Sequence, residues 1–507
     1  MSNSGNPNDA GGAQAVGNGK TFMGHPRGLS TLFFTELWER FSYYGMRALL
    51  VLYMTQETAN ANPGLGLDVG TATAIYGLYT AFVYLLSLPG GWVADNIWGQ
   101  RKAVFVGGSI IAAGHFSMAI PYDFFFFAGL VLIVLGTGLL KPNVSTMVGD
   151  LYPQGGAQRD AGFSIFYMGI NIGAILGPTL CGLLGEGYNW HLGFSLAGFG
   201  MLLGLISYKV GAPNLGTAGL LKTDDTPEII NRKTRNFYTT LSVVAAVIIV
   251  FAFLVSSGVL SVTLQAVAQV LGYSIVAITL VFFSYIIFFA GHNRDEQKKL
   301  AAILWLFILS AIFWSGFEQA GSSLNLFAKD LTNRFVFGWQ MPASWLQNIN
   351  PVFIVILAPV FGWLWTFLAN YKLNPSIPVK FSMGLLGIAA GFIVISWGAM
   401  QATPENPVTP AWLVVTYFLH TTGELCLSPV GLSSITKLAP KNRVGQMMGI
   451  WFVSTSLGNL FAGLVAGQME DLDPSMLFWY VALISGGAGI VALLMAPPIK
   501  KLIGKVN

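Results

Sequence analysis

Charged side chains are scarce in this sequence. Asp, Glu, Lys and Arg make up 9% of its 507 residues, whereas about 25% is usual for a soluble domain. Hydrophobic residues account for 54%, and the mean hydropathy is +0.63. This balance excludes a soluble globular protein and indicates a polytopic membrane protein, whose main partner is the lipid bilayer.

Cysteine and known enzyme motifs are also scarce, which excludes further classes. The two cysteines, Cys181 and Cys426, lie inside apolar runs, so no disulfide framework is indicated. No HExxH motif, P-loop or Cys/His metal cluster occurs, and Ser434 and Lys437 fit an SxxK pattern without the companion motifs of acylating enzymes. We therefore expect no enzymatic activity, no metal and no cofactor. The basic residues are dispersed through loops, so no nucleic-acid partner is expected.

The sequence does contain 14 apolar runs of about 20 residues, which is the length that spans a bilayer. These runs lack the alternation of a β-barrel, so an all-α polytopic fold is predicted. With the N-terminus inside, 21 of the 26 Lys and Arg residues fall in inside segments, two fall outside and three lie within spans. Because cytoplasmic loops are enriched in these residues, both termini are predicted to be cytoplasmic.

The two halves of the chain resemble one another. In each half a proline in mid-span is followed by a second proline 11 residues later and then by a glycine-rich helix that allows close helix packing. The matching positions are Pro142, Pro153, Gly173 and Gly177, and Pro429, Pro440, Gly463 and Gly467. The predicted segments are a disordered cytoplasmic tail (1–28) without a signal peptide, an N-terminal six-helix bundle (29–210), a cytoplasmic linker (211–236), a peripheral transmembrane hairpin (237–291), a C-terminal six-helix bundle (292–500) and a cytoplasmic tail (501–507).

Charges inside the spans are few, and each is costly, at roughly 3 kcal/mol near the bilayer centre. The bases are Arg40, Arg47 and Lys141, and the acids are Glu36, Glu39, Glu318 and Glu424. Helical periodicity places the polar residues of the first span on one face, which must look into a cavity. An ion pair between Glu36 and Arg40 that only makes the helix insertable remains an alternative for those two residues.

The remaining intramembrane charges need partners from other helices. All three bases lie in the first half, whereas the lone acids Glu318 and Glu424 lie in the second. Ion pairs across the interface of the halves would form in one closed state and separate in the other, which is the behaviour of a gate. With four acids against three bases, one carboxylate lacks a full countercharge and is a ready proton carrier. His115 and His420 are interpreted as structural histidines or as histidines of an interfacial belt.

Two sequence motifs add a resemblance to a known family. Residues 36–45, ELWERFSYYG, and residues 166–173, FYMGINIG, match the ExxERFxYYG and FYxxINxG signatures of the proton-coupled oligopeptide transporters, a branch of the major facilitator superfamily. Residues 90–102, GGWVADNIWGQRK, look like the superfamily's loop between its second and third helices. The resemblance covers residues 29–500. It implies a major facilitator fold with two six-helix bundles and a two-helix insertion.

The resemblance also implies a function and its residues. The chain would be a bacterial inner-membrane symporter that imports di- and tripeptides together with protons, acting as a monomer. Proton coupling would involve Glu36, Glu39, Arg40 and Glu318. Substrate binding would involve Arg40, Tyr43, Tyr44, Arg47, Tyr79, Lys141, Asn171, Trp314, Asn350, Glu424 and Trp451. The gate pairs would be Arg47 with Glu318 on the outer side and Lys141 with Glu424 on the inner side.

Two departures and one rival function accompany this resemblance. Phe317 stands where some relatives have a second acid, and Thr80 follows Tyr79 where animal members use a histidine. Both departures shift the proton load onto the first-span carboxylates and Glu318. The rival function is proton-coupled transport of nitrate or another small anion on the same fold. Trp314 and Trp451 are equally compatible with an interfacial aromatic belt.

Overall fold

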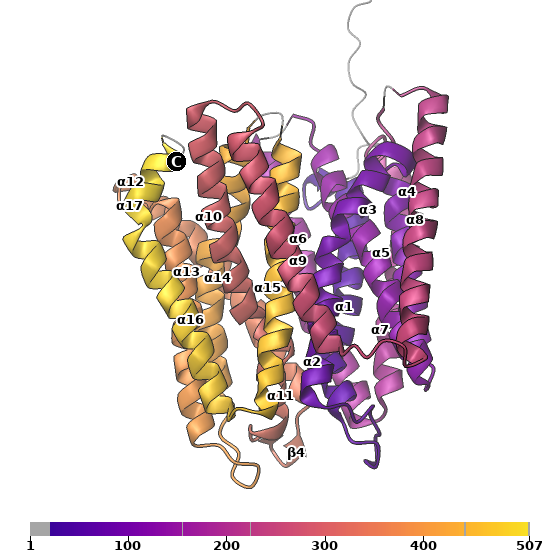
Figure 1. Ribbon diagram of the computed structural model, residues 1–507, viewed down its shortest axis with the longest axis vertical. Coiled ribbons are helices and arrows are strands. Elements are labelled where there is room, and N and C mark those ends of the chain that lie inside the picture. Colours follow the sequence, from indigo (N-terminus) through magenta and orange to yellow (C-terminus); the bar gives the residue numbers. More distant parts are fainter. Residues whose placement is uncertain (1–20, 155, 224, 441–442, 505–507) are drawn as a thin grey trace, which may run out of the picture.

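The computed structural model describes residues 21–154, 156–223, 225–440 and 443–504. Long helices run side by side through most of the molecule (Figure 1). The first half contains α1 (Gly28–Thr55), α2 (Val69–Leu85), α3 (Ser87–Val93), η1 (Ala94–Trp98), α4 (Gln100–Met118), α5 (Asp123–Asp150), α6 (Gly156–Gly187), α7 (Trp190–Gly211) and η2 (Ala212–Leu215). Between the halves lie α8 (Pro227–Ser256) and α9 (Leu264–Phe288).

The second half begins with a long helical segment that is divided into α10 (Arg294–Phe317), a short 3-10 turn, η3 (Glu318–Gly321), and α11 (Ser323–Asp330). Its further helical elements are η4 (Ala343–Asn348), α12 (Ile349–Asn370), α13 (Ile377–Met400), α14 (Ala411–Leu438), α15 (Val444–Ala466), η5 (Gly467–Glu470), α16 (Pro474–Leu494) and α17 (Ala496–Ile503). Two short antiparallel hairpins join β1 (Thr21–Phe22) to β2 (His25–Pro26) and β3 (Phe335–Val336) to β4 (Trp339–Gln340).

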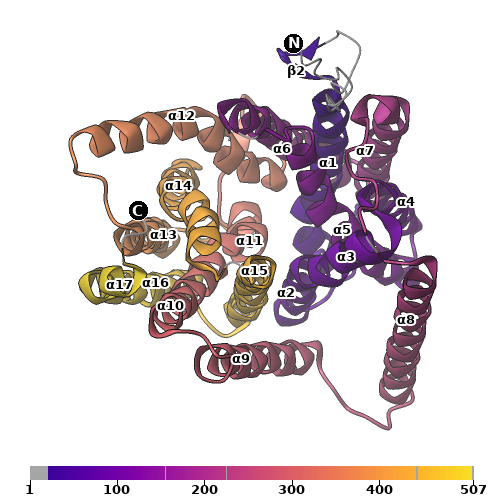
Figure 2. The ribbon, with the colours of Figure 1, turned by 90° about the horizontal axis from the view of Figure 1, so that it is seen from above.

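Each of the 14 predicted spans corresponds to a helical segment. Within the described residues, 11 segments are long and apolar enough to cross a membrane. The other three predicted spans are α1, α4 and α14, with 28, 19 and 28 residues. Figure 2 shows α1–α7 gathered on one side and α10–α17 on the other, which gives two helical bundles. The predicted all-α fold with two bundles is confirmed.

Glycines permit the closest helix contacts, as the repeated glycine pattern predicts. A methyl group added at Gly173 of α6 would lie 2.3 Å from the carbonyl oxygen of Leu37 on α1. A methyl group at Gly463 of α15 would lie 2.4 Å from the carbonyl oxygen of Thr73 on α2. Both distances are far below van der Waals contact, so a larger residue would force the helices apart. The glycine of α6 thus packs against a helix of its own half, whereas the glycine of α15 packs against a helix of the other half.

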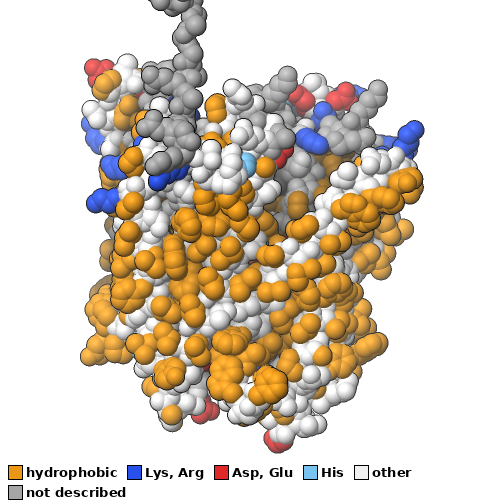
Figure 3. All heavy atoms as spheres, turned by 180° about the vertical axis from the view of Figure 1, so that it is seen from behind, with side chains coloured by type: hydrophobic (Ala, Val, Ile, Leu, Met, Phe, Trp, Pro, Cys, Tyr) orange, Lys and Arg blue, Asp and Glu red, His pale blue; other side chains and the backbone are white. Residues whose placement is uncertain are grey.

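The two ends of the molecule differ in charge. Lysine and arginine side chains gather at the end where α1 begins and α17 lies, above a broad hydrophobic belt (Figure 3). We call this the basic end. Lys329, in the last turn of α11, and Arg334, just before β3, lie at the opposite end. The segregation of basic residues along the chain is thus also a segregation in space.

Two predicted segments differ from the structure in detail. Most of the expected disordered tail (1–28) lies outside the described residues, but residues 21–26 form the β1–β2 hairpin, and His25 hydrogen-bonds Tyr152 at 2.9 Å. The expected hairpin (237–291) is peripheral, yet its helices lie apart, with α8 beside η1 and α9 beside α2, α10 and α15 (Figure 2). The α8 helix also begins at Pro227, because its first turns extend beyond the apolar run on which the boundary was based.

Candidate functional site

A cavity of about 290 Å³ lies between the two bundles. Its walls come from α1, α2, α5 and α6 of the first half and from α10, η3, η4, α12 and α14 of the second. Among the residues lining it are Glu36, Arg40, Tyr44, Arg47, Lys141, Asn171, Trp314, Glu318, Asn350 and Glu424. Ten of the 14 residues singled out from the sequence therefore meet in one cavity.

The charges of α1 form a compact buried cluster. The Nε atom of Arg40 lies 3.0 Å from Glu36 Oε1 and also donates to Glu39. The guanidinium lies 5.2 and 5.9 Å from the ring centroids of Tyr43 and Tyr44, within cation–π range. Glu36 Oε2, Glu39 Oε1 and Arg40 Nη2 have no hydrogen-bond partner among the described residues. The simple i,i+4 pair therefore exists, but Arg40 is shared between two acids.

Arg47 lies on α1 about two turns beyond Arg40, and it joins the two halves. It forms an ion pair with Glu318, at the junction where α10 ends and η3 begins. Its Nε atom also donates to the hydroxyl of Tyr76 on α2, at 2.7 Å. A methyl group at Gly321 would lie 2.0 Å from that hydroxyl, so the glycine makes room for the tyrosine. The break after α10 thus places a lone acid where α1 and α2 can reach it.

Lys141 lies at an interruption of α5. It precedes Pro142, which has no N–H to donate and leaves the ladder of hydrogen bonds incomplete. Asn143 donates to the carbonyl oxygen of Leu139 at 2.7 Å, within the same turn. The ammonium of Lys141 lies 3.6 Å from the ring centroid of Tyr84. This cation–π contact holds the lysine on the first-half wall of the cavity.

Glu424 of α14 lies on the second-half wall. The Nδ2 atom of Asn350 donates to Glu424 Oε2 at 3.1 Å and to the hydroxyl of Thr421 at 3.0 Å. Asn171 of α6 donates to the carbonyl oxygen of Tyr167 at 2.9 Å. Among the described residues, Lys141 and Glu424 form no ion pair with each other or with any other group. Of the two predicted gate pairs, Arg47 with Glu318 is thus formed and Lys141 with Glu424 is separated.

Four residues from the sequence analysis do not line the cavity. Glu39, Tyr43 and Tyr79 lie behind its wall, where the rings of Tyr43 and Tyr79 stack with centroids 6.4 Å apart. Trp451 is buried against Phe381, with centroids 6.2 Å apart. Trp314 lines the cavity. The structure therefore separates the two tryptophans that the sequence could not tell apart.

The sequence analysis missed several lining residues. Tyr84, Gln347 and Tyr417 all line the cavity. Tyr84 lies on α2 five residues beyond Tyr79, which is about 140° around the helix, so the position of Tyr79 gave no signal for it. His420 also lines the cavity, although it is 1% exposed and packs against Phe392. His115 hydrogen-bonds Ser42 at 2.6 Å, as expected of a structural histidine.

Side-chain hydrogen bonds also join the halves at the end away from the basic end. Glu186 at the end of α6 accepts from the backbone N–H groups of Ala343 and Ser344, at 2.7 and 3.0 Å, and from the Ser344 hydroxyl, at 2.5 Å. Asn325 of α11 donates to the carbonyl oxygen of Ala48 at 2.9 Å. With the pair of Arg47 and Glu318, these contacts close this end of the interface.

Sequence and structure comparisons agree on the relatives of the chain. Residues 101–480 match the model of the POT family. The chain is 42% identical to the peptide transporter YePEPT of Yersinia enterocolitica, over 96% of the chain and 97% of the relative. It is 38% identical to a di-/tripeptide transporter of Lactococcus lactis, over 96% of the chain and 98% of the relative.

Solved structures give the same result. The chain superposes on a crystal structure of the peptide transporter POT in complex with sulfate, with a TM-score of 0.89 and 42% identity. That match covers 96% of the chain and 98% of the solved chain. The two-bundle arrangement, the cavity between the bundles and the sequence match therefore lead to one assignment. The chain belongs to the POT family, a family of transporters.

Proposed function

We propose that the chain is a proton-coupled symporter that imports di- and tripeptides across the bacterial inner membrane. The observation that carries the proposal is the distribution of charge in the cavity, with Arg40 and Lys141 on the first-half wall and Glu424 on the second. A peptide of any sequence offers only its carboxylate, its ammonium and its amides as constant features. A cavity with bases on one wall and an acid on the other matches these constants. Relatives named as peptide transporters support the same substrate class.

The proposed binding roles follow the two walls. The peptide carboxylate is bound by Arg40 and Lys141, supported by Tyr43, Tyr44 and Tyr79. The peptide ammonium is bound by Asn171, Asn350 and Glu424. Trp314 offers apolar area for variable side chains, and Trp451 supports the wall from behind. Glu424 already accepts a hydrogen bond from Asn350, so an ammonium would find a positioned carboxylate.

Alternating access follows from the two gate pairs. With the basic end facing the cytoplasm, both termini are cytoplasmic, and the end closed by Arg47 and Glu318 faces outward. The separated pair of Lys141 and Glu424 then corresponds to an open inner gate. Closing that pair while Arg47 leaves Glu318 would expose the cavity to the other side. Glu36, Glu39, Arg40 and Glu318 couple this exchange to a proton.

The alternatives have less support. An anion alone would not need Glu424 with two asparagines in the cavity, and the relatives cited above are named as peptide transporters. The chain's relatives are transporters, so we propose that it carries out no catalysis. We also propose that one chain suffices for transport, because its two halves together supply both walls of the cavity and both gate pairs.

The proposal is tested with purified protein in proteoliposomes. A proton gradient should drive accumulation of a labelled dipeptide, and tripeptides should compete with it. An ionophore that collapses the gradient should abolish accumulation but leave counterflow exchange. Free amino acids and nitrate are the matched competitors. Preferential competition by free amino acids would contradict peptide specificity, and preferential competition by nitrate would favour the rival function.

A further inference from the structure

A second cavity of about 640 Å³ lies at the basic end of the second half, away from the central site. It is bounded by the segment from the end of α12 to the start of α13, by the last turns of α14 and by α17. Its lining includes four lysines, Lys372, Lys380, Lys437 and Lys500. None of its 15 lining residues is Asp or Glu. The cavity wall thus concentrates positive charge.

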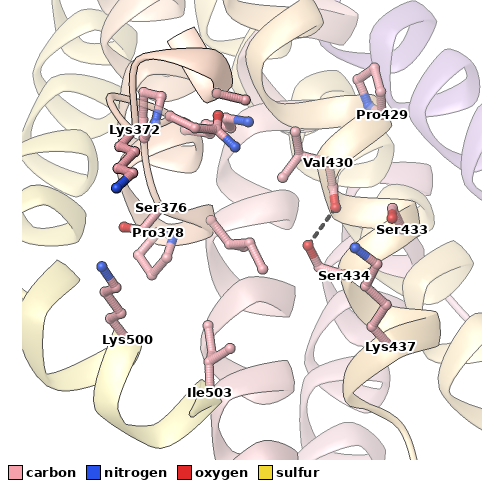
Figure 4. Close-up of a pocket in the computed structure, with 15 residues that line it drawn as sticks. Lys372, Ser376, Pro378, Pro429, Val430, Ser433, Ser434, Lys437, Lys500 and Ile503 are labelled. Carbon is pink, nitrogen blue, oxygen red and sulfur yellow. Dashed lines mark hydrogen bonds between the residues drawn. The ribbon is translucent and has the colours of Figure 1, made fainter. Parts of the chain in front are cut away.

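The lysines enter this cavity from opposite sides. Figure 4 shows Lys372 and Lys500 on one side with their ammonium groups turned toward each other, and Lys437 on α14 across from them. Lys372 has a φ angle of 58°, a left-handed conformation that ends α12. Like charges directed into a common space repel one another, so an anion placed between them would be stabilised.

Lys380 is a further lysine of the cavity wall, and it is largely buried. This residue, in the first turn of α13, is only 8% exposed. Its ammonium lies 4.4 Å from the ring centroid of Trp365 on α12. Within the described residues its Nζ atom has neither a carboxylate partner nor a hydrogen-bond acceptor. Its low exposure reduces the screening of the ammonium charge by water, so an anionic ligand in the cavity would be bound favourably.

The remaining lining residues suit a phosphate group joined to an apolar body. Ser433 and Asn374 supply neutral polar groups near the lysines, whereas Ile377, Val430 and Ile503 supply apolar surface. Ser434 of the SxxK pattern donates to the carbonyl oxygen of Val430 at 2.6 Å (Figure 4). Its proton is therefore engaged by its own helix, which argues for binding and against nucleophilic chemistry at this serine.

We propose that this cavity binds the phosphodiester headgroup of an anionic phospholipid of the inner leaflet. The cavity lies at the helix ends of the basic end, where such headgroups would be located, and basic pockets between helices on this side of a membrane fit them. The lysines contact the phosphate, and the apolar residues contact the first part of the acyl chains. Binding at this site does not depend on which substrate the central cavity carries.

Native mass spectrometry of the purified full-length protein tests the proposal. The probes are phosphatidylglycerol, phosphatidylcholine and inorganic phosphate. Phosphatidylglycerol should bind, phosphatidylcholine should bind far more weakly, and millimolar inorganic phosphate should not displace the lipid. The double variant Lys372→Gln/Lys500→Gln should bind phosphatidylglycerol roughly 30-fold more weakly, since each lysine near a phosphate contributes about fivefold. Lys380→Met should weaken binding in the same direction.

The control changes the same net charge outside the cavity. Lys209→Gln/Lys501→Gln removes two exposed lysines at the basic end, of which Lys501 is the chain neighbour of Lys500. This variant should bind phosphatidylglycerol as the parent does. Equal binding by the cavity and control variants would overturn the site. Displacement by inorganic phosphate, or equal binding of phosphatidylcholine, would overturn the lipid assignment. Dipeptide binding at the central cavity reports folding independently. A variant that loses only lipid binding has therefore lost the lipid site, whereas a variant that loses both lipid and dipeptide binding is misfolded.

Discussion

Arg47 of α1 and Glu318 at the end of α10 form an ion pair that joins the two halves of the protein. The hydroxyl of Tyr76 accepts a further hydrogen bond from Arg47, so the guanidinium is held from both halves. The second oppositely charged pair in the cavity, Lys141 and Glu424, is separated, with each residue held by its own half. One closed and one separated pair is the arrangement required if the two gates alternate.

Replacing Glu318 should loosen the closed end. Glu318→Gln leaves Arg47 buried without its countercharge, which costs about 3 to 5 kcal/mol in the conformation that contains the pair. The conformation open at that end does not contain the pair and is penalised less. A cysteine at Ala343, which is fully buried in η4, should therefore react at least tenfold faster with a membrane-impermeant maleimide in this variant.

The control for this prediction removes both charges. Arg47→Gln/Glu318→Gln leaves no unpaired charge, so labelling at the introduced cysteine should return toward the parent rate. Labelling that is unchanged by Glu318→Gln would show that the ion pair contributes nothing to closure. Labelling of the double variant as fast as that of the single variant would show that the effect does not arise from the unpaired arginine.

Lys141 should be required for both binding and accumulation. Lys141→Ala removes a base from the substrate cavity and leaves Glu424 without its gate partner, so uphill dipeptide uptake should be abolished. Tyr84→Leu removes only the ring beneath the ammonium, a contact worth about 0.5 to 2 kcal/mol, and should change dipeptide affinity by roughly 2- to 30-fold. Tyr84→Phe keeps the ring and is the matched control. Normal accumulation by Lys141→Ala would rule out the gate assignment.

The fold was largely predictable because hydrophobic length and the positions of Lys and Arg both follow from the bilayer. Each of the 14 predicted spans corresponds to a helical segment, and the glycines of α6 and α15 make the expected close contacts. Boundaries set by apolar composition were less accurate. The α8 helix begins ten residues before the expected hairpin. Its first turns carry charged side chains, so they fall outside the apolar run that set the predicted boundary, although the helix includes them.

The charged residues that line the cavity could be predicted from the sequence, whereas its neutral residues were harder to predict. Intramembrane charges are costly, so their positions alone indicate a polar cavity. Tyrosines and tryptophans have several roles in membrane proteins, and only packing distinguishes them. Trp451 is thus behind the wall and Trp314 on it, although both fit the same sequence pattern. Glu186 was missed because it lies at the end of its span, where a charge is not unusual.

Glu186 should contribute to the closed end independently of the ion pair. Its carboxylate accepts three hydrogen bonds from Ala343 and Ser344, and Glu186→Ala leaves these donors unpaired, at about 1 to 3 kcal/mol for each buried group. Glu186→Gln retains one acceptor oxygen and should be less affected. The readout is labelling of a cysteine at Leu346, which is 5% exposed in η4. Equal labelling of parent, Gln and Ala variants would contradict this role.

The last prediction concerns the acids of α1. Arg40 is shared by Glu36 and Glu39, and its Nη2 atom has no partner among the described residues. Ionised acids restrain the guanidinium, whereas protonation of one acid weakens that restraint and allows Arg40 to bind a peptide carboxylate. Proton and peptide binding should then strengthen one another by the same factor. Glu36→Gln/Glu39→Gln, which imitates permanent protonation, should keep peptide binding and counterflow but lose gradient-driven accumulation.

The measurement compares counterflow with proton-driven uptake of the same labelled dipeptide in the same proteoliposome preparation. Retained counterflow shows that the variant is folded and still alternates between its two conformations, so any loss of accumulation then reports coupling alone. Uphill accumulation by the double variant would mean that Glu36 and Glu39 only position Arg40. In that case the proton must be carried elsewhere. Glu318 is then the best remaining carrier, because it is the acid whose protonation would separate the halves at Arg47.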